Sequence, residues 1–431
     1  MDFNSIKDEA KELNQQGEIL MQSNQKEEAY KKFIKAMDID PMMPDSYQNL
    51  GIYYASIGKY EEAKNMLKKA MMIEKNPYYS FLYGNICVMN DELANAITSY
   101  QQAVQLGYDS ATIMFFIAKT YQALNEYAMA LRYYQKAIQK DPIQSVYRRH
   151  RISLLIGLKE YEQAEKEADD YITNLPDDYD AYYLKILLLR QQKKKDEVYA
   201  FTKKVSCLFP EDAGLLSEYI SSCIDFHQIE EAKRLITFAK SLKHYEKDQH
   251  KIVRLEAIVL GTEEKYDEAI ALIEQYLNIN DIYDMDLSLL LIRLYVNAKK
   301  YEELKAYSQK MISLKHFDQL YFASIYYECF AMKQLNEPEA KTNFKKANSL
   351  YRMYSLDKPD LFELYVYRVM CLKEIEEYDK AIELIDFVIS TGANHIKLHE
   401  MKAEIYDLQG RTIKAKEERE IVSQLSAMDN E

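Results

Sequence analysis

Glycine and proline are scarce in this sequence of 431 residues, which contains 10 glycines and 8 prolines. Average usage would give roughly 50 of the two together. Turn-rich all-β folds need these residues at their turns, and Rossmann and P-loop domains need glycine where the backbone meets a phosphate. The deficit therefore argues against both classes of fold.

Cysteine and long apolar runs are also scarce. The five cysteines are odd in number and form no C-x-x-C pair, which argues against a disulfide framework or a zinc site and favours a reducing compartment. No run approaches the roughly 18 apolar residues of a transmembrane helix, and residues 1–9 do not have the pattern of a signal peptide. We therefore expect a cytoplasmic protein that needs no membrane, metal or cofactor.

Positive charge is in deficit. The chain has 56 lysines and arginines against 69 aspartates and glutamates, for a net charge of −13. Nucleic acids and anionic membranes are bound by cationic surfaces, so this balance argues against both as general partners.

A short motif recurs along the chain, as in Tyr60-Glu61-Glu62-Ala63 and Tyr161-Glu162-Gln163-Ala164. Its last residue, which we call the anchor, occurs twelve times and is alanine at every position except two. The anchors are Ala29, Ala63, Ala96, Ala130, Ala164, Val198, Ala232, Ala269, Leu304, Ala340, Ala381 and Ala415. Most successive anchors are about 34 residues apart, and a nearly constant period of this length indicates a repeat array.

The pattern resembles the tetratricopeptide repeat, a helix–turn–helix unit of about 34 residues. The second repeat matches it best, with Tyr47 in place of the usual tryptophan. It is followed by Leu50, Gly51, Tyr54, Gly58, Tyr60, Ala63, Leu67 and Ala70. The resemblance implies an all-α, right-handed superhelical solenoid of stacked antiparallel helix pairs. Small residues on the first helix, such as Gly51, then meet the anchor on the second.

The spacing predicts the organisation of the chain. We expect a lead-in at residues 1–9, seven regular repeats at 10–247, five divergent repeats at 248–424 and a tail at 425–431. The widest gap between anchors predicts an insertion near residues 349–360, and a smaller one is expected near 243–249.

No set of residues indicates catalysis, so we expect no enzyme and assign no catalytic, cofactor-binding or metal-binding residue. The basic cluster Arg148, Arg149 and Arg151 stands out. Arg148 and Arg151 occupy repeat positions where tryptophan and leucine are usual, and nothing nearby in the sequence compensates them. Such breaks concentrate at functional sites, although structural ion pairs produce them too.

The family resemblance implies that first helices line a concave groove that binds a peptide or partner protein. The repeat positions that line this groove in the family correspond to nine residues of this sequence. We call them the predicted groove: Tyr78, Phe81, Asn85, Phe115, Lys119, Gln122, Arg149, Ser153 and Tyr183. The family's carboxylate clamp for chaperone tails is not expected, because Glu18 stands where an asparagine is needed.

The favoured function is a non-enzymatic interaction scaffold that binds a segment with acidic and apolar residues. Two alternatives remain at this point. One is a peptide-sensing regulator without a DNA-binding domain of its own, and the other is an RNA-binding helical array, which the net charge disfavours. The oligomeric state is not predicted.

Overall fold

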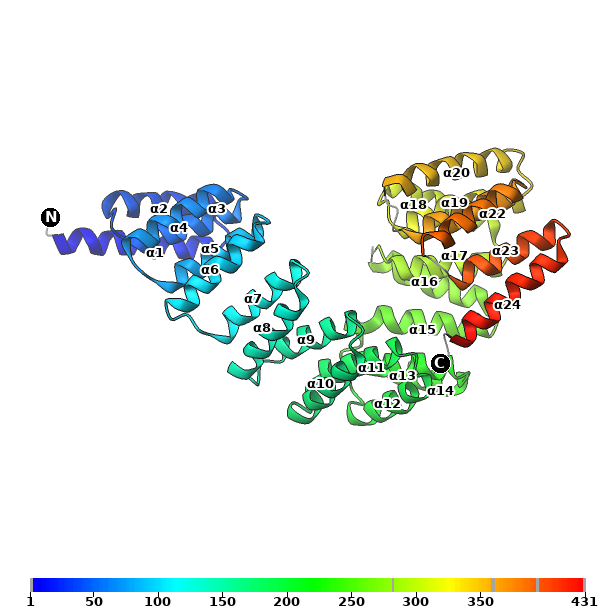
Figure 1. Ribbon diagram of the computed structural model, residues 1–431, viewed down its shortest axis with the longest axis horizontal. Helices are drawn as coiled ribbons and strands as arrows, with labels where there is room; N and C mark the ends of the chain where they lie inside the picture. Colours follow the sequence, from blue (N-terminus) through cyan, green and yellow to red (C-terminus); the bar gives the residue numbers. More distant parts are fainter. Residues whose placement is uncertain (1–2, 281–282, 358–360, 393–394, 429–431) are drawn as a thin grey trace. The chain divides into compact units, whose positions relative to one another are not determined.

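The computed structural model describes residues 3–280, 283–357, 361–392 and 395–428. Twenty-four α-helices, α1 to α24, and one short 3-10 helix, η1, make up the secondary structure of these residues, which contain no β-strand (Figure 1). None of these helices combines the length and the hydropathy required to cross a bilayer.

The chain forms two compact units, residues 1–192 and 193–431, and each is described by itself. The first unit contains α1 (Phe3–Gln22), α2 (Lys26–Ile39), α3 (Pro44–Ser56), α4 (Tyr60–Ile73), α5 (Pro77–Met89), α6 (Leu93–Gln105), α7 (Ala111–Ala123), α8 (Tyr127–Lys140), α9 (Ser145–Gly157), α10 (Tyr161–Asn174) and α11 (Tyr179–Gln191). The second unit contains α12 (Lys195–Leu208), α13 (Ala213–Asp225), α14 (Ile229–Lys240), η1 (Tyr245–Asp248), α15 (Gln249–Thr262), α16 (Tyr266–Asn280), α17 (Met285–Asn297), α18 (Tyr301–Leu314), α19 (Gln319–Gln334), α20 (Ala340–Asp357), α21 (Phe362–Glu374), α22 (Tyr378–Ser390), α23 (Ile396–Leu408) and α24 (Thr412–Met428).

Within each unit, consecutive helices pack against one another as antiparallel pairs, and each pair packs against the next (Figure 1). In the first unit α1 packs on α2, α3 on α4, and so on to α9 and α10. In the second unit the same relation joins α13 to α14 and continues to α23 and α24. The expected all-α fold of stacked helix pairs is therefore confirmed.

The turns inside the repeats share one backbone conformation. Twelve of them contain a residue with φ between +56° and +77°. These residues are Asn24, Gly58, Asp91, Asn125, Lys159, Lys193, His227, Glu264, Lys299, Asn336, Glu376 and Gly410. Each lies five residues before its anchor, except Asn336, which lies four before Ala340. A left-handed residue reverses the chain between two helices, and glycine, asparagine and aspartate adopt this conformation most easily.

The anchors are fully buried, as the repeat pattern predicts. Ala29, Ala63, Ala96 and Ala130 each have 0% of their surface exposed. Opposite them, Gly84 lies so close to the second helix of its repeat that a Cβ atom would be 2.5 Å from the ring of Tyr100. The small side chains therefore allow the paired helices to approach closely.

Proline follows the second helices at a fixed distance. Helices α2, α8, α10 and α12 each end two residues before Pro41, Pro142, Pro176 and Pro210, respectively. Proline lacks the amide donor and clashes with the preceding turn, so it prevents the helix from continuing.

Several predicted boundaries change. Residues 3–9 belong to α1 and are not a separate lead-in, and residues 425–428 belong to α24 and are not a tail. The insertion expected near 349–360 lengthens α20, which has 18 residues and ends at Asp357, while residues 358–360 lie outside the described residues. Near 243–249 the extra residues form η1. The division into compact units at residue 192 concerns packing, so the predicted border between regular and divergent repeats at 247 stays a prediction.

Candidate functional site

The residues of the predicted groove come from four first helices of the first unit. Helix α5 carries Tyr78, Phe81 and Asn85, α7 carries Phe115, Lys119 and Gln122, α9 carries Arg149 and Ser153, and α11 carries Tyr183. Helices α5, α7 and α11 begin with side-chain caps that fix their start, whereas α9 has no such cap. The Asn76 side chain accepts a hydrogen bond from the backbone of Tyr78, and the hydroxyl of Ser110 accepts one from that of Ile113.

An unbroken row of aromatic contacts runs across α5, α7 and α9. The ring of Tyr78 lies 5.9 Å from that of Phe81, between centroids, and Phe81 lies 5.3 Å from Phe116. Phe116 lies 6.1 Å from Phe115, and Phe115 lies 5.0 Å from His150. These distances are in the range of favourable aromatic pairs, so the row forms one rigid strip. We call these five residues the aromatic row.

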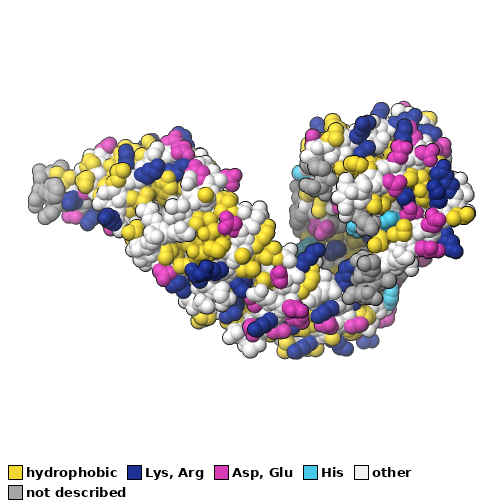
Figure 2. Space-filling model, viewed as in Figure 1, with side chains coloured by type: hydrophobic (Ala, Val, Ile, Leu, Met, Phe, Trp, Pro, Cys, Tyr) yellow, Lys and Arg dark blue, Asp and Glu magenta, His cyan; other side chains and the backbone are white. Residues whose placement is uncertain are grey.

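The members of the aromatic row differ in exposure. Tyr78 is 39% exposed, whereas Phe81 is only 6% exposed and packs against Tyr100 and Tyr108. The expectation that Phe81 faces solvent is therefore wrong, and its role is in the core. Phe115 is half-buried. In Figure 2, hydrophobic side chains gather on the visible face of the first unit between charged ones.

The two amides of the predicted groove are already engaged. The hydroxyl of Tyr100 donates to Asn85 Oδ1 at 2.7 Å, and the hydroxyl of Tyr134 donates to Gln122 Oε1 at 2.7 Å. Each amide thus satisfies the hydroxyl of a buried tyrosine on the second helix of its own repeat. Their other polar atoms are what a partner would meet.

The three basic side chains of this region differ in their surroundings. Lys119 is exposed, and its ammonium lies 5.8 Å from the centroid of the Phe115 ring. Arg149 is also exposed, but its guanidinium forms an ion pair with Asp180 on α11. Burial, together with the charges of Lys119 and Arg149, lowers the pKa of His150 below its usual value. Lys119 is therefore the cation that this region presents most openly.

Ser153 and Tyr183 complete the predicted groove. Ser153 lies on α9 and is exposed, and Tyr183 lies on α11 and is half-buried. The nine residues of the predicted groove thus differ in exposure, and their arrangement as one groove stays a prediction.

Arg151 is not an uncompensated charge. It is 8% exposed, and its guanidinium forms two hydrogen bonds to Glu167 on α10, at 2.7 Å and 2.8 Å, and a third to the carbonyl of Leu131. The prediction that nothing nearby compensates Arg151 is wrong, because the compensating carboxylate comes from the second helix of the same repeat. Its role is structural.

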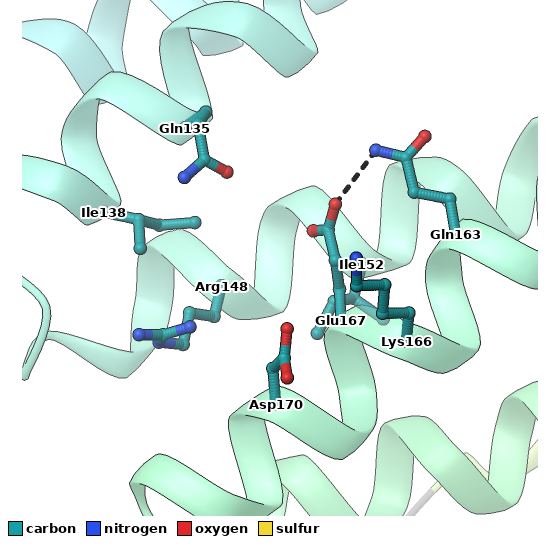
Figure 3. A pocket seen from close by; sticks show the side chains of 8 residues that line it. All are labelled: Gln135, Ile138, Arg148, Ile152, Gln163, Lys166, Glu167 and Asp170. Atoms are coloured by element: carbon teal, nitrogen blue, oxygen red, sulfur yellow. Dashed lines mark hydrogen bonds between the residues drawn. The ribbon is translucent and has the colours of Figure 1, made fainter.

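Arg148 lies on a different face of α9 and lines a pocket of about 390 Å³, shown in Figure 3. Two residues of α8, Gln135 and Ile138, lie on one side of this Arg148 pocket, and α10 supplies the other side with Lys166 and Asp170. The Nε atom of Arg148 is buried and has no hydrogen-bond partner among the described residues. A ligand-contacting role for Arg148 stays a prediction.

Glu18 accepts hydrogen bonds from both Asn14, at 3.1 Å, and Asn49, at 2.7 Å. Asn14 and Asn49 stand, like Glu18, at positions of the family's carboxylate clamp, and their amide donors are therefore already engaged by a carboxylate of the chain itself. No group of three or more histidine, cysteine, aspartate or glutamate side chains in the described part of the chain is arranged to hold a metal ion.

Comparison with known proteins agrees with this geometry. The family model described as tetratricopeptide repeat matches residues 44–77 and 111–143, which cover α3 with α4 and α7 with α8. The chain contains tetratricopeptide repeats. The twelve left-handed turns show that repeats of this kind continue well beyond the two matched segments.

Three similar proteins illustrate the range of tetratricopeptide repeat proteins. Anaphase-promoting complex subunit 3 of Schizosaccharomyces pombe is 22% identical over 39% of this chain and 26% of its own length. The human cell division cycle protein 16 homolog is 29% identical over 28% of this chain and 20% of its own length. The solved structure of pilF from Pseudomonas aeruginosa is 20% identical, with a TM-score of 0.39, over 49% of this chain and 96% of that one. This tetratricopeptide repeat chain thus spans about a quarter of the first relative and a fifth of the second.

Proposed function

We propose that this protein is a non-enzymatic interaction scaffold and that its first unit binds a segment of a partner protein along α5, α7 and α9. The aromatic row is the observation that carries the proposal. It joins three successive repeats into one strip, and it begins at an exposed ring, Tyr78. Exposed aromatic side chains held rigidly by their neighbours are the usual centre of a protein interface.

The charges beside the row define the partner that fits. Lys119 lies over Phe115 and is exposed, and no ion pair involving it occurs among the described residues. Arg149 adds positive charge, but Asp180 already neutralises it in part. A segment with an acidic residue next to an apolar one would pair with Lys119 and cover the rings of Tyr78 and Phe115.

The cysteines support the proposal that the protein is not an enzyme, and they also bear on the compartment of the cell in which it acts. All five are free. Burial raises the pKa of Cys87 to about 11 and that of Cys329 to about 12, which keeps both thiols protonated and unreactive. Free, protonated thiols fit a reducing compartment, and we propose the cytoplasm.

The relatives support the same kind of role. One of them is named as a subunit of a multi-subunit complex, and its similarity to this chain extends over 170 residues. By this proposal the chain likewise contributes a repeat array to an assembly. Its specific partner follows from the site chemistry above and not from those names.

Site-specific photo-crosslinking tests this function. A photoreactive phenylalanine analogue placed at Tyr78 or at Lys119 is expected to crosslink the same partner protein in cells. The matched control places the analogue at Arg132, which is exposed on α8. Crosslinking of that partner from Arg132 with equal yield, or from none of the three positions, would contradict the proposed surface.

A further inference from the structure

The second unit contains a larger cavity than the Arg148 pocket, in the corresponding part of its repeat. It lies between the second helices α16 and α18, over the first helix α17, and its volume is about 590 Å³. We call it the Ser288 pocket. It is separate from the predicted groove, which belongs to the first unit.

One residue that lines this cavity, Ser288, is small. Ser288 lies sixteen residues before the anchor Leu304, and the same repeat position carries Tyr47 before Ala63 and Tyr182 before Val198. Those tyrosines are buried, and their hydroxyls donate to the carbonyls of Pro41 and Pro176, respectively. Serine is much smaller than tyrosine, so no ring from α17 occupies this repeat position beside the pocket.

The walls of the Ser288 pocket are aromatic. The rings of Tyr283 and His316 lie 4.4 Å apart, between centroids, at an angle of 42°. The hydroxyl of Tyr307 is 2.8 Å from Ser288 Oγ, and Tyr283 donates a hydrogen bond to Asp318. These contacts hold the rings in place, so the pocket offers flat faces that are fixed before a ligand arrives.

The charges of the Ser288 pocket are mainly negative. Its lining includes two carboxylates, Glu274 and Glu303, and one ammonium, that of Lys310. Glu274 accepts a hydrogen bond from the hydroxyl of Tyr295, whereas Glu303 forms no ion pair among the described residues. The apolar residues Leu277 and Met311 supply the remaining surface. A long side chain with an apolar stem and a cationic end matches this lining.

We propose that the Ser288 pocket binds an arginine side chain of a partner polypeptide. The guanidinium stacks on the rings of Tyr283 and His316 and pairs with Glu303, and the methylene groups contact Leu277 and Met311. A planar guanidinium suits aromatic faces better than an ammonium does, which favours arginine over lysine. The net charge of −13 also attracts basic segments to the protein. This site is independent of the proposed function of the first unit.

Saturation-transfer NMR on the full chain tests the proposal with small probes. The probe is the blocked pentapeptide acetyl-Gly-Gly-Arg-Gly-Gly-amide, and its control contains citrulline, which has the same shape without the charge. We expect saturable binding of the arginine peptide and about tenfold weaker binding of the citrulline peptide, because a charge-assisted hydrogen bond is lost. The corresponding lysine peptide should bind more weakly than the arginine peptide.

Three variants locate the binding. Glu303→Gln should weaken the arginine peptide about tenfold, whereas Glu302→Gln, which makes the same change at the adjacent exposed position, should leave binding unchanged. Ser288→Tyr restores the ring found at Tyr47 and should abolish binding while the protein stays folded.

Three results would overturn the proposal. They are equal affinity for the arginine and citrulline peptides, equal effects of the changes at Glu302 and Glu303, and unchanged binding in a folded Ser288→Tyr protein. Free arginine that bound more tightly than the pentapeptide would instead indicate a small-molecule site. If the first unit does not bind a partner along α5, α7 and α9, the results expected for the arginine peptide stay the same.

Discussion

The guanidinium of Arg151 on α9 is held by the carboxylate of Glu167 on α10 through two hydrogen bonds, Nε to Oε2 at 2.7 Å and Nη2 to Oε1 at 2.8 Å. The pair is largely removed from water, because Arg151 is 8% exposed. It joins the two helices of one repeat, α9 and α10. Removal of this ion pair should therefore lower the free energy of unfolding.

Glu167→Ala leaves the Arg151 charge buried without its partner. We expect this to lower the free energy of unfolding by about 3–5 kcal/mol, measured by urea denaturation. The double variant Arg151→Met, Glu167→Leu removes both charges and should regain most of that stability, since apolar replacement of a buried ion pair is often neutral. A double variant as unstable as the single one would show that the pair is not the cause.

Gly84→Ala should destabilise the first unit. The new Cβ would lie 2.5 Å from the ring of Tyr100, which is completely buried, so we expect a cost of about 1–3 kcal/mol. Gly157→Ala is the matched control, because a Cβ there meets no atom within 4 Å. Hydrogen exchange should be faster in α5, α6 and the repeats next to them, as stability in a repeat array couples mainly to neighbouring repeats. Equal effects of the two substitutions would count against the close approach of these helices.

His150 should make the first unit sensitive to acid. Its pKa is lowered from 6.5, first by burial and then by Lys119 and Arg149, so the unfolded chain binds its proton more readily than the folded one. Stability should therefore fall as the pH drops below about 6.5. We expect His150→Gln to reduce the loss of Tm between pH 7.5 and pH 5.5, whereas His244→Gln, at an exposed position, should not. Identical losses in the wild type and both variants would refute this account.

Native thiol labelling should distinguish one cysteine from the other four. Cys207 is exposed, whereas Cys87, Cys223, Cys329 and Cys371 are buried, and burial raises their pKa values. Intact-mass analysis should find one fast label in the native protein and five after denaturation without reductant. Fewer than five labels in the denatured protein would reveal a disulfide and contradict the proposed reducing compartment.

Much of the fold could be predicted from the sequence, because the repeat makes the same physical demand at each period. A buried small anchor such as Ala63 and a turn residue such as Gly58 recur at fixed spacing, and both have the roles that the pattern implies. The helix extension at Ser349–Asp357 could not be predicted in this way. An insertion of that size is equally compatible with a loop or with a longer helix.

The candidate site was predicted less completely. The family resemblance included Phe81 in the predicted groove, but the burial of Phe81 depends on Tyr108 and Phe116, which come from later in the chain. The partner of Arg151 lies sixteen residues later, and the same spacing joins Lys240 to Glu256. Opposite charges at that spacing are therefore a signal that sequence reasoning could have used.

The central claim is that a partner binds along α5, α7 and α9. The affinity of the crosslinked partner protein for two charge-reversal variants of this chain tests it most directly. Lys119→Glu places a negative charge beside Phe115 on the aromatic row, and Arg132→Glu makes the same change at an exposed position on α8. Both variants should keep the helicity and Tm of the wild type. The account predicts that Lys119→Glu raises the Kd about tenfold, while Arg132→Glu leaves it within about twofold of the wild type. Equal Kd values for the two folded variants would contradict binding along α5, α7 and α9.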